Sequence, residues 1–521
     1  MQSCEKVLVL PTRSLVATCV VATCIAAVGA VWNEGAPRIT GPKVFGATPG
    51  RRFMHPFTTC GNREGLRWSI GGTLPHGVSL DPRTGILSGC IQKSGRWTFI
   101  VRATNVLGGA ERPFALVVGD GMRALTPPMG WSSWNACSSD VDQRHVEENA
   151  AAMVSMGLAA HGYTYVNVDS CWQGRRNDVT KALDADDRVF PNMALMVSRI
   201  HGLGLKAGIY STPMVWAWGG SDTRMLQGGS GYPLDPDHFH PFFGGCGKRG
   251  YEVEDARQFA RWGFDWLKYD WSMTDLEHTR RMREALDKTE RDIVLQVSTS
   301  AQFKDAAKYG RYSEVARHGG DTKDEWTFLR THCFMAADRW LPFIRPGFWV
   351  DLDMLAIGPI RQWHNAKLPY ACEPLPDDLR NRLTPDEQMA HFAWWAIIPT
   401  PLFISCDIPH IDNFTLALVT NTDLIDINQD YPAMPAVPTD FPGQCRLWTR
   451  ELSDGRTVLG FFNLGEDSWK MERTLDTPRL TRDVLAMKDL GKCSRLSETI
   501  PPHACKVYLL EKTANNERTK R

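Results

Sequence analysis

The sequence predicts an α/β fold in which a (β/α)8 barrel is preceded by a β-sandwich module and followed by an antiparallel β domain. The chain has 521 residues, which is long for a single hydrophobic core, so several domains are expected. From Leu125 to Asp430, short β-rich runs alternate with helical patterns, as is typical of βα units around a parallel sheet. Segments of purely β character flank this region on both sides.

Residues 1–31 predict a secretory signal peptide. Lys6 and Arg13 come before an apolar run at 15–31, and small residues such as Ala30 suit cleavage at its end. The run is slightly short for a bilayer span, which favours a signal peptide over the alternative, an uncleaved membrane anchor. The rest of the chain contains no other apolar run of spanning length. We therefore expect a secreted or periplasmic protein without further membrane contact.

Residues 36–120 predict a small β-sandwich. In "GRWTFIVRATN" at 95–105, apolar and polar side chains alternate, which indicates a half-buried strand. Together with the preceding "LPHGVSLDPRTGILSG", this segment resembles the immunoglobulin-like modules that are attached to many bacterial surface and secreted enzymes. Spacing or docking is the expected role, because no residue pattern in this segment indicates chemistry.

The barrel region, residues 122–432, contains eight candidate strands. They are 129–135, 163–172, 205–212, 265–272, 292–300, 313–321, 347–355 and 400–407. Between the first two, residues 141–158 carry one apolar stripe typical of a helix, with Asp140 available as its N-cap. A doubly wound open sheet is the alternative, but no glycine-rich phosphate loop follows a strand.

After residue 430 the chain returns to β character. Residues 436–512 contain "CRLWTREL", a turn signal at Asp454-Gly455 and a closing "CKVYLLEK", which predict a C-terminal antiparallel β-sandwich. Residues 513–521 are a polar tail.

Composition narrows the functional classes. Lys plus Arg and Asp plus Glu are equal at 59 each, which removes the electrostatic basis for a nucleic-acid partner and favours a neutral substrate. The 19 Trp suit both core packing and stacking against sugar rings.

The chain has 14 Cys, some of which should pair in an exported protein. Cys60 with Cys90 and Cys137 with Cys171 are the candidate disulfides. No Cys or His spacing indicates zinc, so neither a metal nor another cofactor is expected.

Polar residues recur at the carboxyl ends of the predicted strands, which meet at one face of a parallel barrel. They are Asp169, Tyr210, Lys268, Asp270, Arg317, Asp321, Asp351 and Asp353. Hydrolysis of a glycosidic bond needs two carboxyl groups, one ionised and one protonated. Lys268 is expected to lower the pKa of Asp270, and Asp321 is a candidate acid. The alternatives are a structural Lys268–Asp270 ion pair, an ordinary solvated turn around Asp321, and helix-capping or loop positions for Asp351 and Asp353.

Several motifs make the sequence resemble a known enzyme family. They are "LTPPMGWSSWN", "YVNVDSCW", "LKAGIYSTP", "GFDWLKYDW", "RHGGD", "DLDML.IG", "PLFISCD" and "INQD". Their order and spacing over residues 122–512 are similar to those of glycoside hydrolase family 27, the α-galactosidase family of retaining glycosidases. The resemblance implies a terminal α-galactoside of an oligosaccharide or glycan as substrate, with an α-N-acetylgalactosaminide or a related pyranoside as the alternative. A sugar-binding protein that has lost turnover is the alternative from another class.

The resemblance also implies roles for individual residues. Asp270 corresponds to the nucleophile and Asp321 to the general acid/base. The residues that correspond to the sugar pocket are Asp169, Lys268, Arg317 and Asp353 for its polar contacts, Trp134 and Tyr210 for its aromatic wall, and Ser298 in the loop after the fifth strand. The chain departs from the family at Ser170, Val350 and Ser272, where the family has an Asp, part of an Asn-Asp-Pro-Asp motif and a Cys. These changes retain both catalytic carboxylates and alter the pocket around them.

Overall fold

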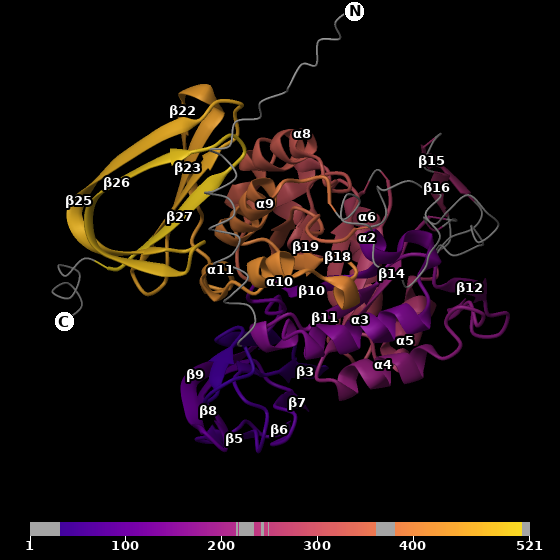
Figure 1. Ribbon diagram of the computed structural model, residues 1–521. Coiled ribbons are helices and arrows are strands. Elements are labelled where there is room, and N and C mark those ends of the chain that lie inside the picture. Colours follow the sequence, from indigo (N-terminus) through magenta and orange to yellow (C-terminus); the bar gives the residue numbers. More distant parts are fainter. Residues whose placement is uncertain are drawn as a thin grey trace, which may run out of the picture.

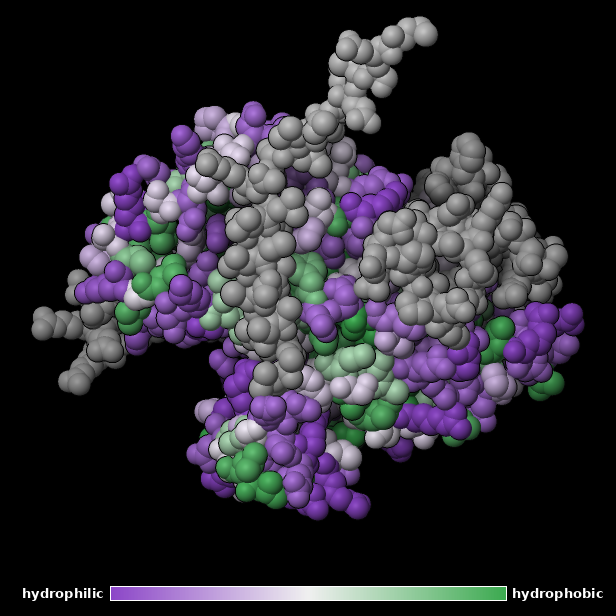
Figure 2. Space-filling view, viewed as in Figure 1, coloured by the Kyte–Doolittle hydropathy of each residue, from purple (hydrophilic) through white to green (hydrophobic). Residues whose placement is uncertain are grey.

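The computed structural model describes residues 32–214, 217, 234–240, 244–247, 250–272, 274–360 and 381–512. The predicted signal peptide and polar tail lie outside these residues. Figure 1 shows three bodies, with the indigo N-terminal module and the yellow C-terminal domain at separate places around the barrel. Hydrophilic residues cover much of the visible face, and hydrophobic ones form scattered small patches (Figure 2).

The central sheet has eight strands in the order β20-β19-β18-β17-β14-β11-β10-β21, and each neighbouring pair is parallel. Their bounds are β10 Met129–Ser132, β11 Tyr165–Val168, β14 Lys206–Ser211, β17 Trp266–Asp270, β18 Val294–Ser298, β19 Val315–Arg317, β20 Trp349–Asp351 and β21 Leu402–Ile404. A parallel bridge between Leu355 and Ile404 joins the two edges of this sheet. The predicted barrel is confirmed, with strands shorter than the β-rich runs, so that Asp169, Asp321 and Asp353 lie past the strand ends.

Helices surround the barrel, and two hairpins extend from it. The helices are α2 Ser133–Cys137, α3 Gln143–Ser155, α4 Met193–Gly202, α5 Glu252–Trp262, α6 Leu276–Leu286, α7 Ala306–Tyr309, α8 Trp326–Phe328, α9 Pro385–Ile397, α10 Asn413–Val419 and α11 Thr422–Asn428. The hairpins are β12 Gln173–Arg176 with β13 Leu183–Ala185, and β15 Leu234–His240 with β16 Gly244–Gly247. Asp142, and not Asp140, caps α3, because its side chain accepts the backbone N–H of His145.

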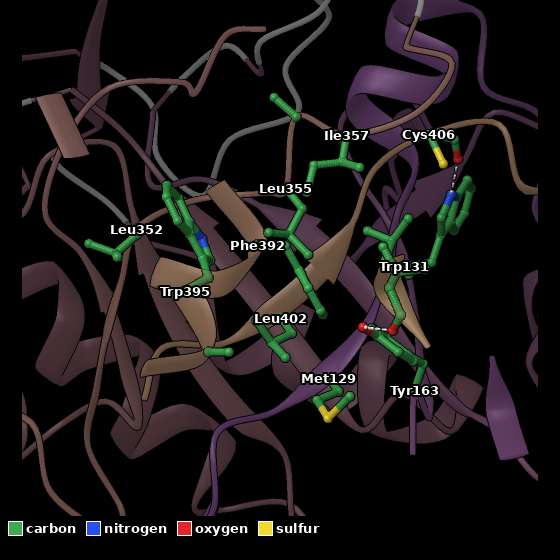
Figure 3. Close-up of a cluster of buried hydrophobic side chains, with 14 of the residues drawn as sticks. Met129, Trp131, Tyr163, Leu352, Leu355, Ile357, Phe392, Trp395, Leu402 and Cys406 are labelled. Atoms are coloured by element: carbon green, nitrogen blue, oxygen red, sulfur yellow. Dashed lines mark hydrogen bonds between the residues drawn. The ribbon is translucent and has the colours of Figure 1, made fainter. Parts of the chain in front are cut away.

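Helix α9 is buried along most of its length because it lies between the barrel and the C-terminal sheet, where it contacts β24 and β27. It starts with a capping box in which Thr384 and Glu387 each bind the other's backbone N–H. Its Phe392 and Trp395 pack near Leu355 and Leu402 in the main core (Figure 3). The Nε1 of Trp395 also donates to Asp353 O at 3.1 Å, so the helix helps to hold the segment after β20 that carries Asp353.

The N-terminal module consists of small sheets whose strand pairs are antiparallel, except that β2 pairs with β9 in parallel. Its strands are β1 Arg38–Thr40, β2 Val44–Ala47, β3 Arg52–Pro56, β4 Thr58–Cys60, β5 Arg67–Gly71, β6 Val78–Leu80, β7 Ile86–Cys90, β8 Gly95–Asn105 and β9 Gly108–Val118. In β8, Phe99, Val101 and Ala103 are buried, as the alternation predicts, and they pack with Trp68 and Phe114. The half-buried strand that the sequence predicts is therefore present.

The module docks where the barrel strands begin, opposite the face on which polar residues collect. The backbone N–H of Arg52 donates to Glu290 O at 2.7 Å, and that of Asp292 donates to Arg52 O at 2.9 Å. The module therefore adds a short strand beside the segment that leads into β18. The Nζ of Lys206, in β14, lies 4.8 Å from the centre of the Phe45 ring.

The C-terminal domain is a six-stranded sheet in the order β22-β23-β24-β27-β25-β26, with antiparallel neighbours. Its strands are β22 Val437–Phe441, β23 Cys445–Glu451, β24 Thr457–Asn463, β25 Trp469–Asp483, β26 Lys488–Ile500 and β27 Cys505–Leu510. The sheet folds around a core that includes Phe461, Leu496 and Tyr508. Gly455 has a φ of 87° at the predicted turn between β23 and β24. Among the described residues, no helix is both long and apolar enough to cross a membrane.

Candidate active site

The carboxyl ends of β11, β17, β18, β19 and β20 bring the predicted site residues together. Alternate residues of a strand face the same side, so Lys268 and Asp270 of β17 share one face while Tyr269 between them packs against Trp271 at 5.1 Å. In the parallel register, Lys268 pairs with Tyr210 of β14, and Asp270 pairs with Ser298 of β18. The apolar run 265–272 thus places the carboxylate of Asp270 at the carboxyl end of the barrel strands.

Lys268 has Asp169 as its principal partner. Its Nζ lies 2.8 Å from Asp169 Oδ2 but 4.0 Å from Asp270 Oδ2. Burial would lower the pKa of Lys268, but Asp169 and then Asp270 outweigh burial and raise it, so the amine stays charged. The backbone N–H of Asp169 in turn donates to Ser133 Oγ at 2.9 Å. The predicted Lys268–Asp270 pair is therefore only the weaker half of a Lys268-centred cluster.

Asp270 is buried, and its carboxylate accepts a hydrogen bond from the hydroxyl of Thr299 at Oδ1. Burial raises the pKa of Asp270 above its ordinary value, although Lys268, Arg317 and Thr299 all oppose this effect. Lys268 does act to lower the pKa of Asp270, as expected. The net shift is nevertheless upward, contrary to the expectation, because the desolvation of the buried carboxylate outweighs the effect of Lys268. Thr299 was not predicted as a site residue, although its position directly after Ser298 was a signal.

Arg317 connects the remaining polar side chains of the site. Its side chain is 0% exposed and donates to Asp353 Oδ1 at 2.9 Å, to Asp321 Oδ1 at 2.7 Å and to Thr299 Oγ1 at 3.3 Å. These carboxylates outweigh burial and raise the pKa of Arg317. Through Thr299 and Arg317, a continuous chain of hydrogen bonds connects the carboxylates of Asp270 and Asp321.

Asp321 faces solvent more than the other site carboxylates do, with 39% of its side chain exposed. Burial would raise the pKa of Asp321, but Arg317 and then Lys268 outweigh it and hold the pKa below its ordinary value. The sequence suggests Asp321 as a protonated acid, whereas the structure favours its ionised form. A role as acid therefore requires that its interaction with Arg317 weakens when substrate binds.

Asp351, the last residue of β20, and Asp353, which follows it, are further buried carboxylates of the site. The backbone N–H of Thr322 donates to Asp353 Oδ2 at 2.6 Å, and that of Asp353 donates to Asp351 Oδ1 at 2.8 Å. The side chain of Gln296, in β18, donates to Asp351 Oδ2. Burial and then the neighbouring Asp353 raise the pKa of Asp351 to about 6. Gln296 was not predicted, because its role depends on the register between strands.

Strained backbone accompanies three of these strand ends. Cys171, Thr299, Ser300 and Asp353 are non-glycine residues with φ of 81°, 47°, 60° and 76°. Cys171 follows β11, Thr299 and Ser300 follow β18, and Asp353 follows β20. Left-handed conformations of such residues are costly and persist where surrounding contacts hold them, often at functional sites.

The remaining predicted pocket residues differ in exposure. Trp134 of α2 is half-buried, whereas Tyr210 and Ser298 are fully buried. The Tyr210 ring lies 5.7 Å from Lys268 Nζ, and its backbone oxygen accepts a hydrogen bond from Trp172 Nε1 at 2.9 Å. Among the described residues, the hydroxyl of Ser298 has no hydrogen-bond partner. Contact of these three side chains with a sugar stays a prediction.

The cysteine predictions have different outcomes. The thiol of Cys60 lies 3.5 Å from His161 Nε2, and that of Cys90 lies 3.3 Å from Gln92 Nε2, so the predicted Cys60–Cys90 bond is wrong. Cys137 and Cys171 are both buried. Their pairing stays a prediction. No cluster of three or more His, Cys, Asp or Glu side chains in the described ranges could hold a metal ion.

Comparison with known proteins agrees with this architecture. The family model described as alpha galactosidase A matches residues 126–225, 239–367 and 380–430. The models for the alpha galactosidase C-terminal beta sandwich domain and for an Ig domain match residues 442–510 and 41–119.

Individual relatives cover most of the chain. Alpha-galactosidase 2 of Arabidopsis thaliana is 30% identical over 80% of this chain and 96% of its own. A Bacteroides fragilis crystal structure, assigned as an alpha-galactosidase, is 27% identical with a TM-score of 0.76 and covers 92% of this chain and 99% of its own. Alpha-galactosidase I of Mortierella vinacea is 26% identical with a TM-score of 0.60 and covers 75% of this chain and 98% of its own.

Proposed function

The chain belongs to the alpha galactosidase A family of glycoside hydrolases, and from that premise we propose that it is a retaining exo-α-glycosidase that removes terminal α-galactosyl groups. The observation that carries the proposal is the connection of Asp270 and Asp321 through Thr299 and Arg317 at the carboxyl ends of the barrel strands. Two carboxyl groups of different environment are what double displacement at a sugar carbon requires.

In the first step, the carboxylate of Asp270 attacks the anomeric carbon while the bond to the leaving oxygen breaks and Asp321 gives that oxygen a proton. In the second step, Asp321 takes a proton from water, the water oxygen attacks the anomeric carbon, and the ester to Asp270 breaks. Asp321 must therefore be protonated first, although Arg317 favours its ionised form. A sugar hydroxyl that binds Arg317 would compete for the same N–H groups and release Asp321 for protonation.

The polar cluster around these carboxylates suits a neutral sugar. We assign the Asp169–Lys268 pair and the Arg317–Asp353 pair to the sugar hydroxyls, because each pair offers both donors and acceptors. Trp134 and Tyr210 would provide the aromatic wall, and Ser298 would lie at the 2-position. The proposed setting is outside the cytoplasm, which rests on the apolar segment at 15–31.

A second candidate activity is hydrolysis of α-N-acetylgalactosaminides. The loop after β18 favours it, because Ser300 is exposed and small, and Ala301 beside it is buried. Such side chains leave room for a larger 2-substituent. A carbohydrate-binding protein without turnover is the alternative from another class.

The first experiment is a screen of aryl α-glycosides with the wild-type chain and with Asp270→Asn. We expect release of the aryl group from the α-galactoside by wild type and none by the variant, because an amide cannot form the glycosyl ester. Asp476→Asn, an exposed position in β25, is the matched control and should keep full activity. Turnover by Asp270→Asn would overturn the nucleophile assignment, and a first-formed β-anomer, detected by NMR, would overturn retention.

A further inference from the structure

The two oxygens of the Asp270 carboxylate have different surroundings. Oδ1 accepts a hydrogen bond from Thr299 Oγ1. Oδ2 faces the Lys268 ammonium at 4.0 Å, which is longer than a hydrogen bond, while that ammonium binds Asp169 at 2.8 Å. One oxygen is therefore held by a neutral hydroxyl, and the other lies in the field of a positive charge that is hydrogen-bonded elsewhere.

Thr299 itself is held firmly in an unfavourable conformation. It is β-branched and has a φ of 47°, a region that such residues rarely adopt. The buried hydroxyl of Thr274 lies 3.1 Å from Ser298 O and 3.0 Å from Thr299 O. On the other side, the backbone N–H of Ala301 donates to Arg317 O at 2.8 Å. These contacts fix the turn and aim the Thr299 hydroxyl at Asp270.

The same hydroxyl connects the nucleophile to the acid/base. Thr299 Oγ1 has one hydrogen, which it donates to Asp270, so its lone pair accepts from Arg317 Nη2 at 3.3 Å. That same Nη2 donates to Asp321 Oδ1 at 2.7 Å. The orientation of both carboxylates thus depends on one Thr side chain and one Arg side chain.

We propose that Thr299 is the positioning residue of the nucleophile: its hydroxyl holds Asp270 Oδ1 and leaves Oδ2 as the oxygen that attacks the anomeric carbon. The inference rests on the proposed function. A lone pair of Oδ2 forms the bond to the anomeric carbon, the electrons of the broken bond pass to the leaving oxygen, and that oxygen takes the proton of Asp321. Oδ1 becomes the carbonyl oxygen of the ester and keeps the Thr299 hydrogen bond. In the second step, the Oδ2–carbon electrons return to the carboxylate, which Thr299 stabilises again.

The inference predicts a specific pH effect. The Thr299 hydrogen bond lowers the pKa of Asp270, so its loss should raise that pKa. Asp270 must be ionised to attack, and the acidic limb of kcat/KM should therefore move to higher pH. A residue that only supported the loop would leave this limb where it is.

The test compares Thr299→Val, which removes the hydroxyl, with Thr299→Ser, which keeps it, on an aryl α-galactoside. We expect Thr299→Val to lower kcat about ten- to a hundredfold, the effect of one hydrogen bond to a charged group, with little change in KM and a shifted acidic limb. Thr299→Ser should keep most of kcat and the wild-type limb. Thr104→Val, on the exposed face of β8, is the matched control.

Three outcomes would overturn the inference: wild-type kcat and limb in Thr299→Val, equal loss in Thr299→Ser, or a limb that does not move. If Thr299→Val does not fold, Thr299→Ala takes its place in the same comparison. Failure of the proposed function gives a different result, because wild type would then release no aryl group from the α-galactoside, or Asp270→Asn would remain active. An inactive Asp270→Asn together with a fully active Thr299→Val would reject only the role of Thr299.

Discussion

Replacement of Arg317 by Met should lower the free energy of unfolding of the barrel, because it removes a buried positive charge and not because it removes packing. Met has a similar length and apolar stem, but it removes the charge that lies between Asp353 and Asp321. The side chain of Asp353 is only 4% exposed, so without Arg317 its carboxylate would be buried without that charge. Removal of one partner of a buried ion pair costs about 3–5 kcal/mol.

Nearly all of this loss belongs to the Asp353 pair. Asp321 is 39% exposed, and solvent-exposed pairs contribute about 0–1 kcal/mol. Because Arg317 lowers the pKa of Asp321, this smaller contribution is present above the ordinary Asp pKa of about 4 and is lost as the pH falls through the lower folded value. The difference between wild type and variant should therefore shrink slightly under acid conditions.

The assay is urea unfolding followed by tryptophan fluorescence at pH 7, with the free energy of unfolding taken from the barrel transition. The matched control is Arg102→Met, whose pair with Glu111 is exposed on the N-terminal module and should contribute less than about 1 kcal/mol. A loss below about 1 kcal/mol for Arg317→Met, with an unchanged m-value, would refute the reasoning.

Two further predictions concern the module and the sugar. Deletion of residues 33–119 should leave kcat on a small aryl α-galactoside nearly unchanged, because no predicted site residue lies there. The deletion should lower Tm, because it uncovers Lys206 and removes the Arg52 backbone hydrogen bonds. A large fall in kcat, or an unchanged Tm in calorimetry, would contradict this prediction. The kcat/KM for an aryl α-galactoside should exceed that for the matching α-N-acetylgalactosaminide by at least about tenfold, or ~1.4 kcal/mol, because the small side chains of Ser300 and Ala301 offer the acetamido group no dedicated partner. Equal or reversed steady-state values would favour the second candidate activity.

The sequence predicted those features that depend on local patterns. Alternation of β-rich and helical segments identified the eight strands, and strand-end positions identified Lys268, Asp270, Arg317 and Asp353. What it could not predict are pairings that depend on register between strands that lie far apart in the chain. Lys268 binds Asp169 more closely than its own neighbour Asp270, and this follows only from the placement of β11 near β17 in the closed barrel.

The role of Thr299 was hidden for a related reason. Its hydroxyl reaches Asp270 only because Thr299 and Ser300 both have left-handed backbone conformations, and no local sequence signal for such a turn exists without Gly, Asn or Asp. The turn is stabilised instead by Thr274 from the segment after β17 and by Arg317 of β19. Likewise, desolvation decides the pKa of Asp270, and burial is a property of the folded barrel.

Strand β19 runs from the amino-terminal end of the barrel to the site. It has only three residues, Val315–Arg317, and Glu314 precedes it. At the amino-terminal end of β19, Glu314 lies 3.4 Å from each of the buried guanidinium groups of Arg123 and Arg283. At the other end, Arg317 binds Asp353 and Asp321. Only two residues separate Glu314 from Arg317, so the ion pairs of Glu314, next to the docked module, help to set the position of the guanidinium that connects the carboxylates of Asp270 and Asp321.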